Sequence, residues 1–414
     1  MYLTREEEKA LAGEYGEAAA LAMELLVKLG DYFGADRMVN ITSAHVEQSL
    51  TIHGDAGLEF VEKLANFGGK FKVLTTINPG SVDKSLIKKF NTPPDVYEKQ
   101  SRLTVAYVKM GALPCQTCTC YYIGNVPNFG DHVAWGDTSA VNYVNSVIGA
   151  RSNFEGPPAA VSAAIVGKTP NYGMHLNEFR SGKVLVKVKA NLSSLSDWDA
   201  LGYIVGKELK SYENIPVFDG LSRPYSTDCL KRLGAALATS GTIPGFHVVG
   251  VTPEARTREE AFKGDKPHDE LEITQRDVNG VYEIFQGEGK VDVVAFGCPH
   301  LSMNELELLA SKYEGRRRAD KTDVWIWTNS FYKQLCKELG YYTKLANSGC
   351  SVACDACTIL LPQAQKKEGF RKDLGISLLV TDSVKLAHYS SQHITVVFKK
   401  TEDCVRISLE GKVG

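Results

Sequence analysis

The sequence contains no long hydrophobic run. In its 414 residues, no apolar stretch approaches the roughly 20 residues that a membrane-spanning helix needs. The first residues, MYLTREEEKALAGEYGEA, are polar and acidic, which is unlike a secretory signal or a transit peptide. We therefore expect a cytoplasmic protein without a membrane partner.

The sequence also lacks a surplus of charge, internal repeats and low-complexity tracts. Its 47 basic and 49 acidic residues leave a formal charge of −2, so no bulk field attracts nucleic acid. A hydrophobic content of 43% and a charged content of 23% are ordinary for a globular protein. At this length we expect two or three subdomains and no nucleic-acid partner.

Cysteine, in contrast, occurs ten times. Disulfides are disfavoured in a reducing compartment, so these thiols serve metal binding, catalysis or simple burial. Cys336 lies in a helical pattern and is predicted to be a small buried apolar residue, and Cys229 and Cys404 are interpreted in the same way. The other cysteines are clustered and need a different account.

The stretch from Gly111 to Arg151 is the one around which the chain is organised. It holds three cysteines within six positions, namely Cys115, Cys118 and Cys120. Polar residues follow them without helical or strand periodicity, a pattern typical of a functional site or a buried loop. Two further cysteine loops, FGCPHLS around Cys298 and GCSVACDACT around Cys357, lie far downstream. We expect the three stretches to converge on one metal site.

The cysteine spacing alone leaves three alternatives open. Thiolates suit tetrahedral zinc, but the spacing differs from the C-x2-C pairs of zinc ribbons and fingers. A 4Fe–4S cluster also needs thiolates, and three of them would leave one iron open as a Lewis acid. A 2Fe–2S cluster is an alternative nuclearity, and the absence of any metal is the third reading.

Strands followed by polar loops recur along the chain. We expect a long amphipathic helix from the capping box at Thr4, then a loop over residues 41–57 and a strand over 71–77. Strands are also expected at 291–296, 324–327 and 376–381, the last leading into a loop over 382–391. Such loops lie where α/β proteins bind ligands. Residues 181–215 are predicted to form a separate lobe or an insertion.

Several phrases of the sequence, in this order, resemble one known family. They are AHVEQSLTIHGDAG, TTINPGS, TCTCYYIGN, FGDHVAWGDTSAV, NSVIGAR, IVGKTPNYGMHL, FHVVGVTPEA, FGCPHLS and LAHYSS. Together they resemble the large subunit of the aconitase X family over about residues 1–395, and the remaining tail lies outside the resemblance. The resemblance implies an α/β, aconitase-like multilayer fold in which loops at strand ends form a central cleft.

The resemblance further implies a hydro-lyase with an iron–sulfur cluster held by three cysteines. Cys298 and Cys357 match the family pattern directly. In the first loop the family's T-C-T-P-Y selects Cys118, while Cys120 replaces the usual proline and Cys115 is a further departure. Either could be a bystander or an alternative ligand, and Cys350 and Cys354 are extra thiols. The family's small swivelling domain is absent from this chain, so a separate small subunit is expected.

Proteins of this kind dehydrate (R)-5-phosphomevalonate or cis-3-hydroxy-L-proline. Both reactions remove a hydroxyl β to a carboxylate, so one mechanism serves, with the open iron taking the hydroxyl and a base taking the proton. By analogy with aconitase, Ser240 before Gly241 is the expected base, although a serine there could merely shape a turn. We expect phosphomevalonate as the substrate, and keep a zinc-stabilised binding protein as the non-enzymatic alternative.

The remaining candidates lie in polar motifs. His45 and Glu47 are expected to orient water or substrate, although His45 could simply satisfy a buried carbonyl. Polar groups expected to bind the phosphate or carboxylate are those of Gly54, Asp55, Ala56, Asn78, Pro79, Asn145, Ser146 and Arg151. For Arg151 a structural ion pair is the alternative. His300 is expected to support a metal ligand. Lys385 is expected to bind the substrate and His388 to belong to the site, with a purely structural role as the alternative for both.

Overall fold

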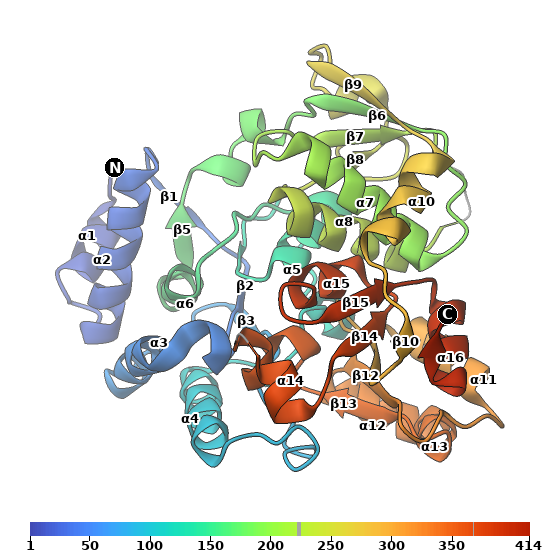
Figure 1. The fold of residues 1–414 in the computed structure, drawn as a ribbon. Coiled ribbons are helices and arrows are strands. Elements are labelled where there is room, and N and C mark those ends of the chain that lie inside the picture. Colours follow the sequence, from blue (N-terminus) through green and yellow to red (C-terminus); the bar gives the residue numbers. More distant parts are fainter. Residues whose placement is uncertain (222–224, 367) are drawn as a thin grey trace.

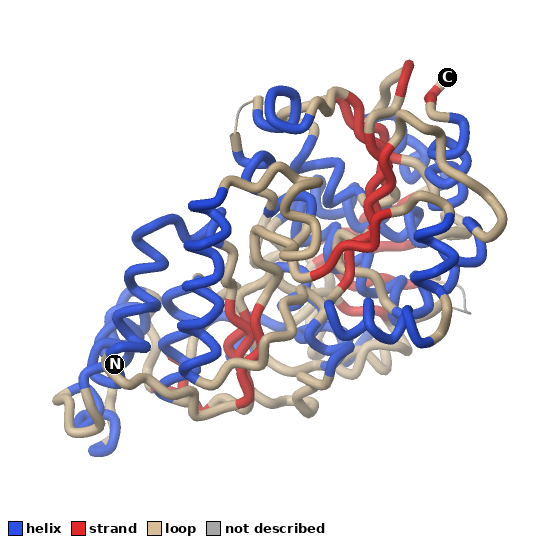
Figure 2. Tube along the Cα trace, turned by 90° about the horizontal axis from the view of Figure 1, so that it is seen from below, coloured by secondary structure: helices blue, strands red, loops and turns tan. Residues whose placement is uncertain are grey.

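The computed structural model describes residues 1–221, 225–366 and 368–414, and its elements group around three parallel sheets. Each of these sheets, together with the helices of the same part of the chain, is called a unit below, and the units are numbered in chain order. The N-terminal helices lie at one end of the molecule and the C-terminal helix at the other, as both views show (Figures 1 and 2). The expected α/β class is confirmed, because helices and parallel strands alternate through most of the chain.

The first unit has a three-stranded parallel sheet in the order β3-β2-β4, formed by β2 (Ser43–Val46), β3 (Leu74–Ile77) and β4 (Ala134–Trp135). An antiparallel pair joins β1 (Met38–Asn40) to β5 (Lys168–Pro170). The helices are α1 (Arg5–Leu11), α2 (Glu17–Tyr32), α3 (Leu50–Asn66), α4 (Pro94–Met110), α5 (Thr138–Tyr143) and α6 (Pro157–Val166). Shorter turns are η1 (Cys120–Ile123), the π-helical η2 (Val144–Ile148), η3 (Gly173–His175) and η4 (Asn177–Arg180).

The second unit has a four-stranded parallel sheet in the order β8-β7-β6-β9. Its strands are β6 (Val184–Val188), β7 (Pro216–Asp219), β8 (His247–Val248) and β9 (Asp269–Ile273). Its helices are α7 (Leu195–Leu209), α8 (Thr227–Gly241), α9 (Arg258–Ala261) and α10 (Gln275–Ile284). Residues 181–215, predicted as a separate lobe, supply β6 and α7 to this unit.

The third unit has a five-stranded parallel sheet in the order β13-β12-β11-β14-β15. Its strands are β11 (Val293–Phe296), β12 (Asp323–Thr328), β13 (Ser351–Cys354), β14 (Leu378–Thr381) and β15 (Thr395–Phe398), with β10 (Gly289–Lys290) paired to β16 (Lys412–Val413). Its helices are α11 (Met303–Tyr313), α12 (Ser330–Glu338), α13 (Tyr341–Asn347), α14 (Gly369–Leu374), α15 (Val384–Ser390) and α16 (Thr401–Glu410), with turns η5 (Thr358–Leu360) and η6 (Pro362–Gln365).

The predicted strands of the third unit are confirmed at β11, β12 and β14. Every residue of β11 and β14 is buried, because helices cover both faces of the parallel sheet. The loop that follows β11 carries Cys298, and α15, which follows β14, carries Lys385. The sheet therefore delivers two site candidates to the same edge.

Four local predictions were wrong. The expected long first helix is broken into α1 and α2, because Gly13 and Gly16 adopt left-handed φ values of 86° and 95°. Residues 41–57 form β2 and the start of α3 rather than a loop. The stretch 111–151, expected to be irregular, contains β4, α5 and η2. Residues 382–391 contain α15, which begins after Ser383 as its N-cap, whereas the polar residues of this stretch had suggested a loop.

A segment over residues 78–93 ties the first unit to the third. The Phe90 ring is fully buried, with its centroid 5.2 Å from Trp327 and 5.0 Å from Trp325. The backbone N–H of Cys354 donates a 2.7 Å hydrogen bond to the Asp83 carboxylate. This segment begins at Asn78, and its Gly80 N–H donates to the Asp355 carbonyl at 2.8 Å, so it packs against the loop that carries Cys357.

Candidate functional site

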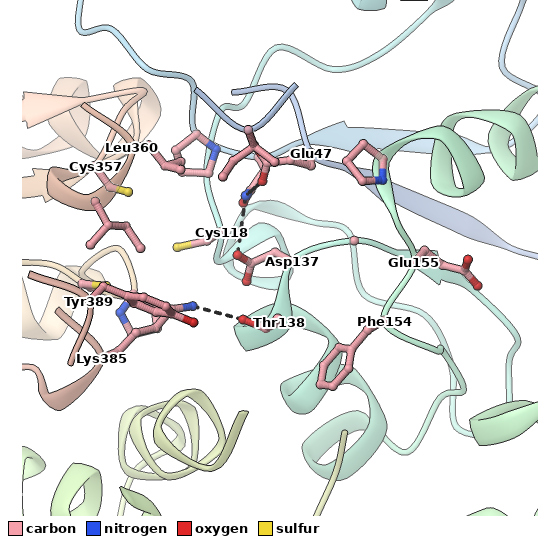
Figure 3. A pocket seen from close by; sticks show the side chains of 18 of the residues that line it. Glu47, Cys118, Asp137, Thr138, Phe154, Glu155, Cys357, Leu360, Lys385 and Tyr389 are labelled. Carbon is pink, nitrogen blue, oxygen red and sulfur yellow. Dashed lines mark hydrogen bonds between the residues drawn. The ribbon is translucent and has the colours of Figure 1, made fainter. Parts of the chain in front are cut away.

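A cavity of about 370 Å³ lies where loops of the first and third units meet. One wall carries Cys118, Cys298, Cys357 and Lys385, and Figure 3 shows the sulfur atoms of Cys118 and Cys357 turned toward the same space. The opposite wall is formed by the segment from Phe154 to Pro157, where α6 begins. The cavity thus has a thiol-bearing end and a mainly apolar end.

The three thiols come from three separate loops and are all buried. Cys118 precedes η1, Cys298 follows β11, and Cys357 precedes η5. Burial raises the pKa of each thiol, to about 11 for Cys298, and the neighbouring thiols of Cys298 and Cys118 raise that of Cys357 further. The thiols therefore lie near one another in a region that disfavours free thiolates.

His300 links all three cysteine loops. Its backbone N–H donates to Cys118 Sγ at 3.3 Å, and its Nε2–H donates to the Ala356 carbonyl at 2.9 Å. The Thr117 hydroxyl then donates to Nδ1 at 3.0 Å, because the ring is neutral and Nε2 carries its proton. Burial lowers the pKa of His300 to about 4, which keeps the ring neutral.

Glu47, Asn78 and Asp137 form a hydrogen-bonded group beside the thiols. The Asn78 amide donates to Glu47 and, at 3.5 Å, to Asp137, as the dashed line to Asp137 shows (Figure 3). The backbone N–H of Ser49 donates to Glu47 at 2.7 Å. Burial, reinforced by the charge of Asp137, raises the pKa of Glu47 to about 7 in spite of these hydrogen bonds. Glu47 can therefore exchange a proton near neutral pH.

Lys385 is the cation at the thiol end of the cavity. Its ammonium donates to Ser139 at 2.6 Å and to Thr138 at 3.3 Å, and its side chain points across the cavity toward α5 (Figure 3). Burial disfavours the charged ammonium, but neighbouring acidic groups, Asp137 first among them, outweigh burial and raise the pKa of Lys385. A charged ammonium here can bind a substrate carboxylate.

The other cavity candidates are also placed. His45 is buried behind Asn78, and Asn78 and Pro79 both line the cavity. Glu155 is buried in the opposite wall, where burial raises its pKa to about 7 and the Thr169 hydroxyl donates to it at 3.4 Å. Figure 3 shows the Glu155 carboxylate turned away from the thiols.

Several expected binding residues lie elsewhere. Gly54, Asp55 and Ala56 fall within α3 at a kink where Gly54 has a φ of 59°, and Asp55 pairs with Lys99 on the surface. These three residues do not line the cavity. The kink is a turn of the backbone within a helix, which explains the glycine.

Asn145, Ser146 and Arg151 are engaged in the protein framework. Asn145 donates to the carbonyls of Ser152 and Pro244, and the hydroxyl of Ser146 accepts from Phe246 N–H at 2.7 Å. Arg151 donates to the His175 carbonyl and to Asn177. The structure does not bring this group to the cavity.

Ser240 also lies outside the cavity lining. It sits near the end of α8, where its hydroxyl donates to the Ala236 carbonyl at 3.0 Å and packs against Gly206 of α7. His388 is half-buried on α15, with Nδ1 3.1 Å from the Tyr203 hydroxyl of α7. Neither side chain is placed to meet a ligand bound beside Cys298.

The remaining cysteines have other surroundings. Cys115 donates to the Ile77 carbonyl, Cys120 is fully buried at the start of η1, and the thiol of Cys354 donates to the Asp355 carboxylate. The predictions of buried, apolar cysteines are confirmed by low exposures, listed here in chain order: Cys229 8%, Cys336 0% and Cys404 0%.

Sequence reasoning did not name most of the residues that line the cavity as site candidates, and Ile52, Asp137, Thr138, Phe154 and Tyr389 are among those it missed. Asp137 carried a detectable signal, because Asp followed by Thr-Ser-Ala is typical of a helix N-cap, and its carboxylate indeed accepts from Ala140 N–H at 2.9 Å. The others are ordinary residues whose role depends on which chain segments meet.

The donor set fits an iron–sulfur cluster. Among the described residues, no three His, Cys, Asp or Glu side chains form a compact group of the kind that holds a single metal ion. The fit rests on donor chemistry, because three buried thiols from three loops face one cavity and clusters take cysteine thiolates. His300 additionally holds the three loops together.

Comparisons with known proteins agree with this geometry. Family models match as the aconitase X first domain over residues 1–178, the second domain over 182–283 and the third domain over 291–410. The chain belongs to the aconitase X family. The crystal structure of Thermococcus kodakaraensis aconitase X in its holo-form superposes with a TM-score of 0.88 at 38% identity, covering 99% of this chain and 100% of that one.

The curated relatives of this aconitase X chain are named dehydratases. The phosphomevalonate dehydratase large subunit of Thermococcus kodakarensis is 42% identical over 87% of this chain and 90% of its own length. That of Methanothermobacter thermautotrophicus is 40% identical over 94% of each chain. The cis-3-hydroxy-L-proline dehydratase of Pseudomonas aeruginosa is 34% identical over 98% of this chain and 70% of its own. The expectation of a hydro-lyase is confirmed, and the non-enzymatic alternative is not retained.

Among the described residues, no helix is both long and apolar enough to cross a bilayer.

Proposed function

We propose that this chain is the large subunit of an iron–sulfur-dependent dehydratase that converts (R)-5-phosphomevalonate to trans-anhydromevalonate 5-phosphate. The observation that carries the proposal is the meeting of Cys118, Cys298 and Cys357 with Glu47 and Lys385 around one cavity. The substrate follows the relatives at about 40% identity, which are named phosphomevalonate dehydratase large subunits. Their names also support a separate small subunit as the partner.

The three thiols would hold the cluster, which we take to be 4Fe–4S with 2Fe–2S as the alternative. When bound through three thiolates, such a cluster supplies an open iron as a Lewis acid for a leaving hydroxyl. All three cysteines are buried apart from the small surface that they present to the cavity.

Lys385 binds the substrate carboxylate in this proposal. Its ammonium lies at the thiol end and is held by Ser139 and Thr138, so its charge has a defined position. Glu47 and the three thiols line the same cavity, so a substrate whose carboxylate is anchored at Lys385 lies in the space that they share. Burial lowers the pKa of His45 to about 4, so its ring is neutral and does not compete with Lys385 for the carboxylate.

Glu47 carries the proton. It accepts the proton from the carbon between the carboxylate and the hydroxyl-bearing carbon, and returns it to the departing hydroxide, so that one water leaves. A carboxyl whose pKa is about 7 suits this exchange at neutral pH. No serine is among the described residues that line the cavity, and Ser240 lies at the α7–α8 contact, so Glu47 takes the role first expected of Ser240.

A second candidate is the dehydration of cis-3-hydroxy-L-proline. Two relatives carry that name, at 34% and 32% identity over 98% and 94% of this chain. Both substrates carry a hydroxyl β to a carboxylate, so the same residues serve either reaction. The lower identity places this activity second.

The decisive experiment is a dehydration assay with anaerobically purified chain and its co-expressed small subunit. Both substrates are supplied in parallel, and visible absorption and iron content are read on the same sample. We expect a brown protein that turns over phosphomevalonate. Turnover of hydroxyproline alone would move the protein to the second function. A colourless, zinc-containing and inactive complex would overturn both.

The proton role of Glu47 has its own test. Glu47→Gln keeps the hydrogen bond from Ser49 but cannot ionise, and we expect kcat to fall at least about a hundredfold with the cluster absorption intact. Asp55→Asn, which alters an exposed carboxylate in α3, is the matched control and should leave kcat unchanged. A Glu47→Gln variant with wild-type kcat would exclude the assignment.

A further inference from the structure

A buried network on α8 holds two segments that carry cavity residues. Arg232 is fully buried, and its guanidinium donates to the carboxylates of Asp199, Glu305 and Asp382 at 3.1–3.2 Å. It also donates to the Asp382 carbonyl at 3.4 Å. Asp382 lies at the end of β14, immediately before the helix that carries Lys385.

Helix α8 also holds the loop that carries Cys298. Lys231 is ion-paired with Glu305 and lies 3.0 Å from Asp228. Its ammonium also donates to the His300 carbonyl at 3.5 Å. Glu305 in turn accepts from Ser302 N–H at 2.9 Å. One face of α8 therefore holds the start of α15 on one side and residues 298–302 on the other.

Ser383 joins these two segments directly. Its hydroxyl donates to the Cys298 carbonyl and accepts from Leu386 N–H at 3.2 Å, as the N-cap of α15. One oxygen thus anchors the Cys298 loop and begins the helix that places Lys385. Ser383 is itself fully buried and does not line the cavity.

The segment around Ser383 has little freedom. Asp199 accepts from Val384 N–H at 3.4 Å, Ser196 donates to the Asp382 carbonyl at 3.1 Å, and Thr401 donates to the Asp382 carboxylate at 2.8 Å. Because the backbone on each side of Ser383 is held from α7, α8 and α16, a displacement of Cys298 has to break the Ser383 hydrogen bond.

We propose that Ser383 is a positioning residue that fixes the Cys298 loop against the first turn of α15 and so sets the place of Lys385 relative to Cys298, with Arg232 as the anchor of that turn. The proposal rests on the proposed function where it assigns Lys385 to the substrate carboxylate. It deepens that function, because it names the contact that holds the metal-binding loop and the carboxylate-binding cation at fixed positions relative to each other.

The test compares three variants of the full chain. Ser383→Ala removes both hydrogen bonds of the hydroxyl, and Ser383→Thr retains the hydroxyl. Thr4→Ala is the matched control, since it removes the N-cap of α1, another seven-residue helix, far from the cavity. The alkylation rate of Cys298 by iodoacetamide is followed by peptide mass spectrometry on the metal-free chain. The kcat and KM are measured on the cluster-loaded complex with its small subunit.

We expect Ser383→Ala to raise the Cys298 alkylation rate at least about fivefold and the KM about tenfold. Factors of this size correspond to the net free energy that one hydrogen bond contributes. Ser383→Thr should stay within about threefold of wild type, and Thr4→Ala should leave both quantities unchanged. Unchanged alkylation and KM in Ser383→Ala would overturn the proposal. Equal shifts in Thr4→Ala would overturn it as well, since they would reflect helix capping in general.

The two proposals fail in different ways. A wild-type complex that turns over neither substrate removes the proposed function, while the alkylation rates still decide whether Ser383 holds the Cys298 loop. A faster Cys298 reaction in Ser383→Ala with a wild-type KM overturns the part of the proposal that concerns Lys385.

Discussion

The imidazole of His45 and the amide of Asn78 lie edge to edge, with His45 Nε2 3.3 Å from Asn78 Oδ1. The Thr76 hydroxyl, 2.9 Å from Nδ1, donates to that nitrogen, so the neutral ring presents its Nε2–H to the Asn78 oxygen. The Asn78 NH2 group is thereby turned toward Glu47 and Asp137. Asn78 therefore connects the buried ring of His45 to the carboxylates of Glu47 and Asp137 by hydrogen bonds.

Replacing Asn78 should therefore move the pH profile of the enzyme. The hydrogen bond from Asn78 lowers the pKa of Glu47 and partly offsets its burial, so its loss in Asn78→Ala should raise that pKa above about 7. Because Glu47 must be ionised to accept a proton, activity falls as the pH drops below this pKa. We expect the acidic limb of kcat/KM to move to higher pH. An unmoved limb would show that another group gives rise to it.

Folding stability should depend on the pH through Glu155. Its pKa is raised from 4.5 to about 7 in the folded protein, so the folded state binds the proton more tightly than the unfolded state. The resulting stability is fully present below pH 4.5 and is lost as the pH rises through about 7, a loss of about 3 kcal/mol. Urea unfolding at pH 5 and pH 8 should show a smaller loss in Glu155→Gln than in wild type. Equal losses would contradict the assignment.

The cysteine assignment predicts a sharp division among variants. Cys298→Ala or Cys357→Ala should abolish both the brown colour and turnover, because each removes one of three thiolates. Cys336→Ala, in α12 and away from the cavity, should keep both. The measurement is visible absorption with iron content and dehydration rate. Activity retained in Cys298→Ala or Cys357→Ala would remove the three-ligand assignment.

The segment over residues 78–93 should be important for stability. Phe90→Ala removes a fully buried ring from its place against Trp325 and Trp327, and we expect a loss of about 3–5 kcal/mol in the free energy of unfolding. Phe331→Ala, which alters a ring that is 64% exposed, should change it by less than about 0.5 kcal/mol. Urea unfolding followed by tryptophan fluorescence measures both. A Phe90→Ala variant as stable as Phe331→Ala would show that the contact is dispensable.

Much of the third unit could be predicted from the sequence. The runs around Val293, Val324 and Leu378 are continuously apolar, and such runs are typical of parallel strands buried on both faces. The capping box at Ser302 predicted the start of α11. Signals of this kind are local, so the sequence carries them in full.

Two sets of predicted site residues show where local signals end. Asn145 and Arg151 are polar residues in an irregular-looking stretch, but their hydrogen bonds go to Pro244 and His175, which come later in the chain. Ser240 precedes a glycine, the feature from which its catalytic role was predicted, yet close packing of α8 on Gly206 accounts for that small-residue pair. A polar residue in a loop looks the same in sequence whether it binds a ligand or a carbonyl.

The sequence by itself determined the α/β class, the main strands of the third sheet, the buried cysteines and the family resemblance, because each depends on neighbouring residues or on ordered motifs. Only the tertiary structure decided which polar groups meet. It brought Cys118 of the first unit to Cys298 and Cys357 of the third. It also placed Asp137 beside Lys385, although 248 positions separate the two residues in the sequence. The physical reason is that burial and charge act through space, and the distances that govern them are set by packing between segments remote in the sequence.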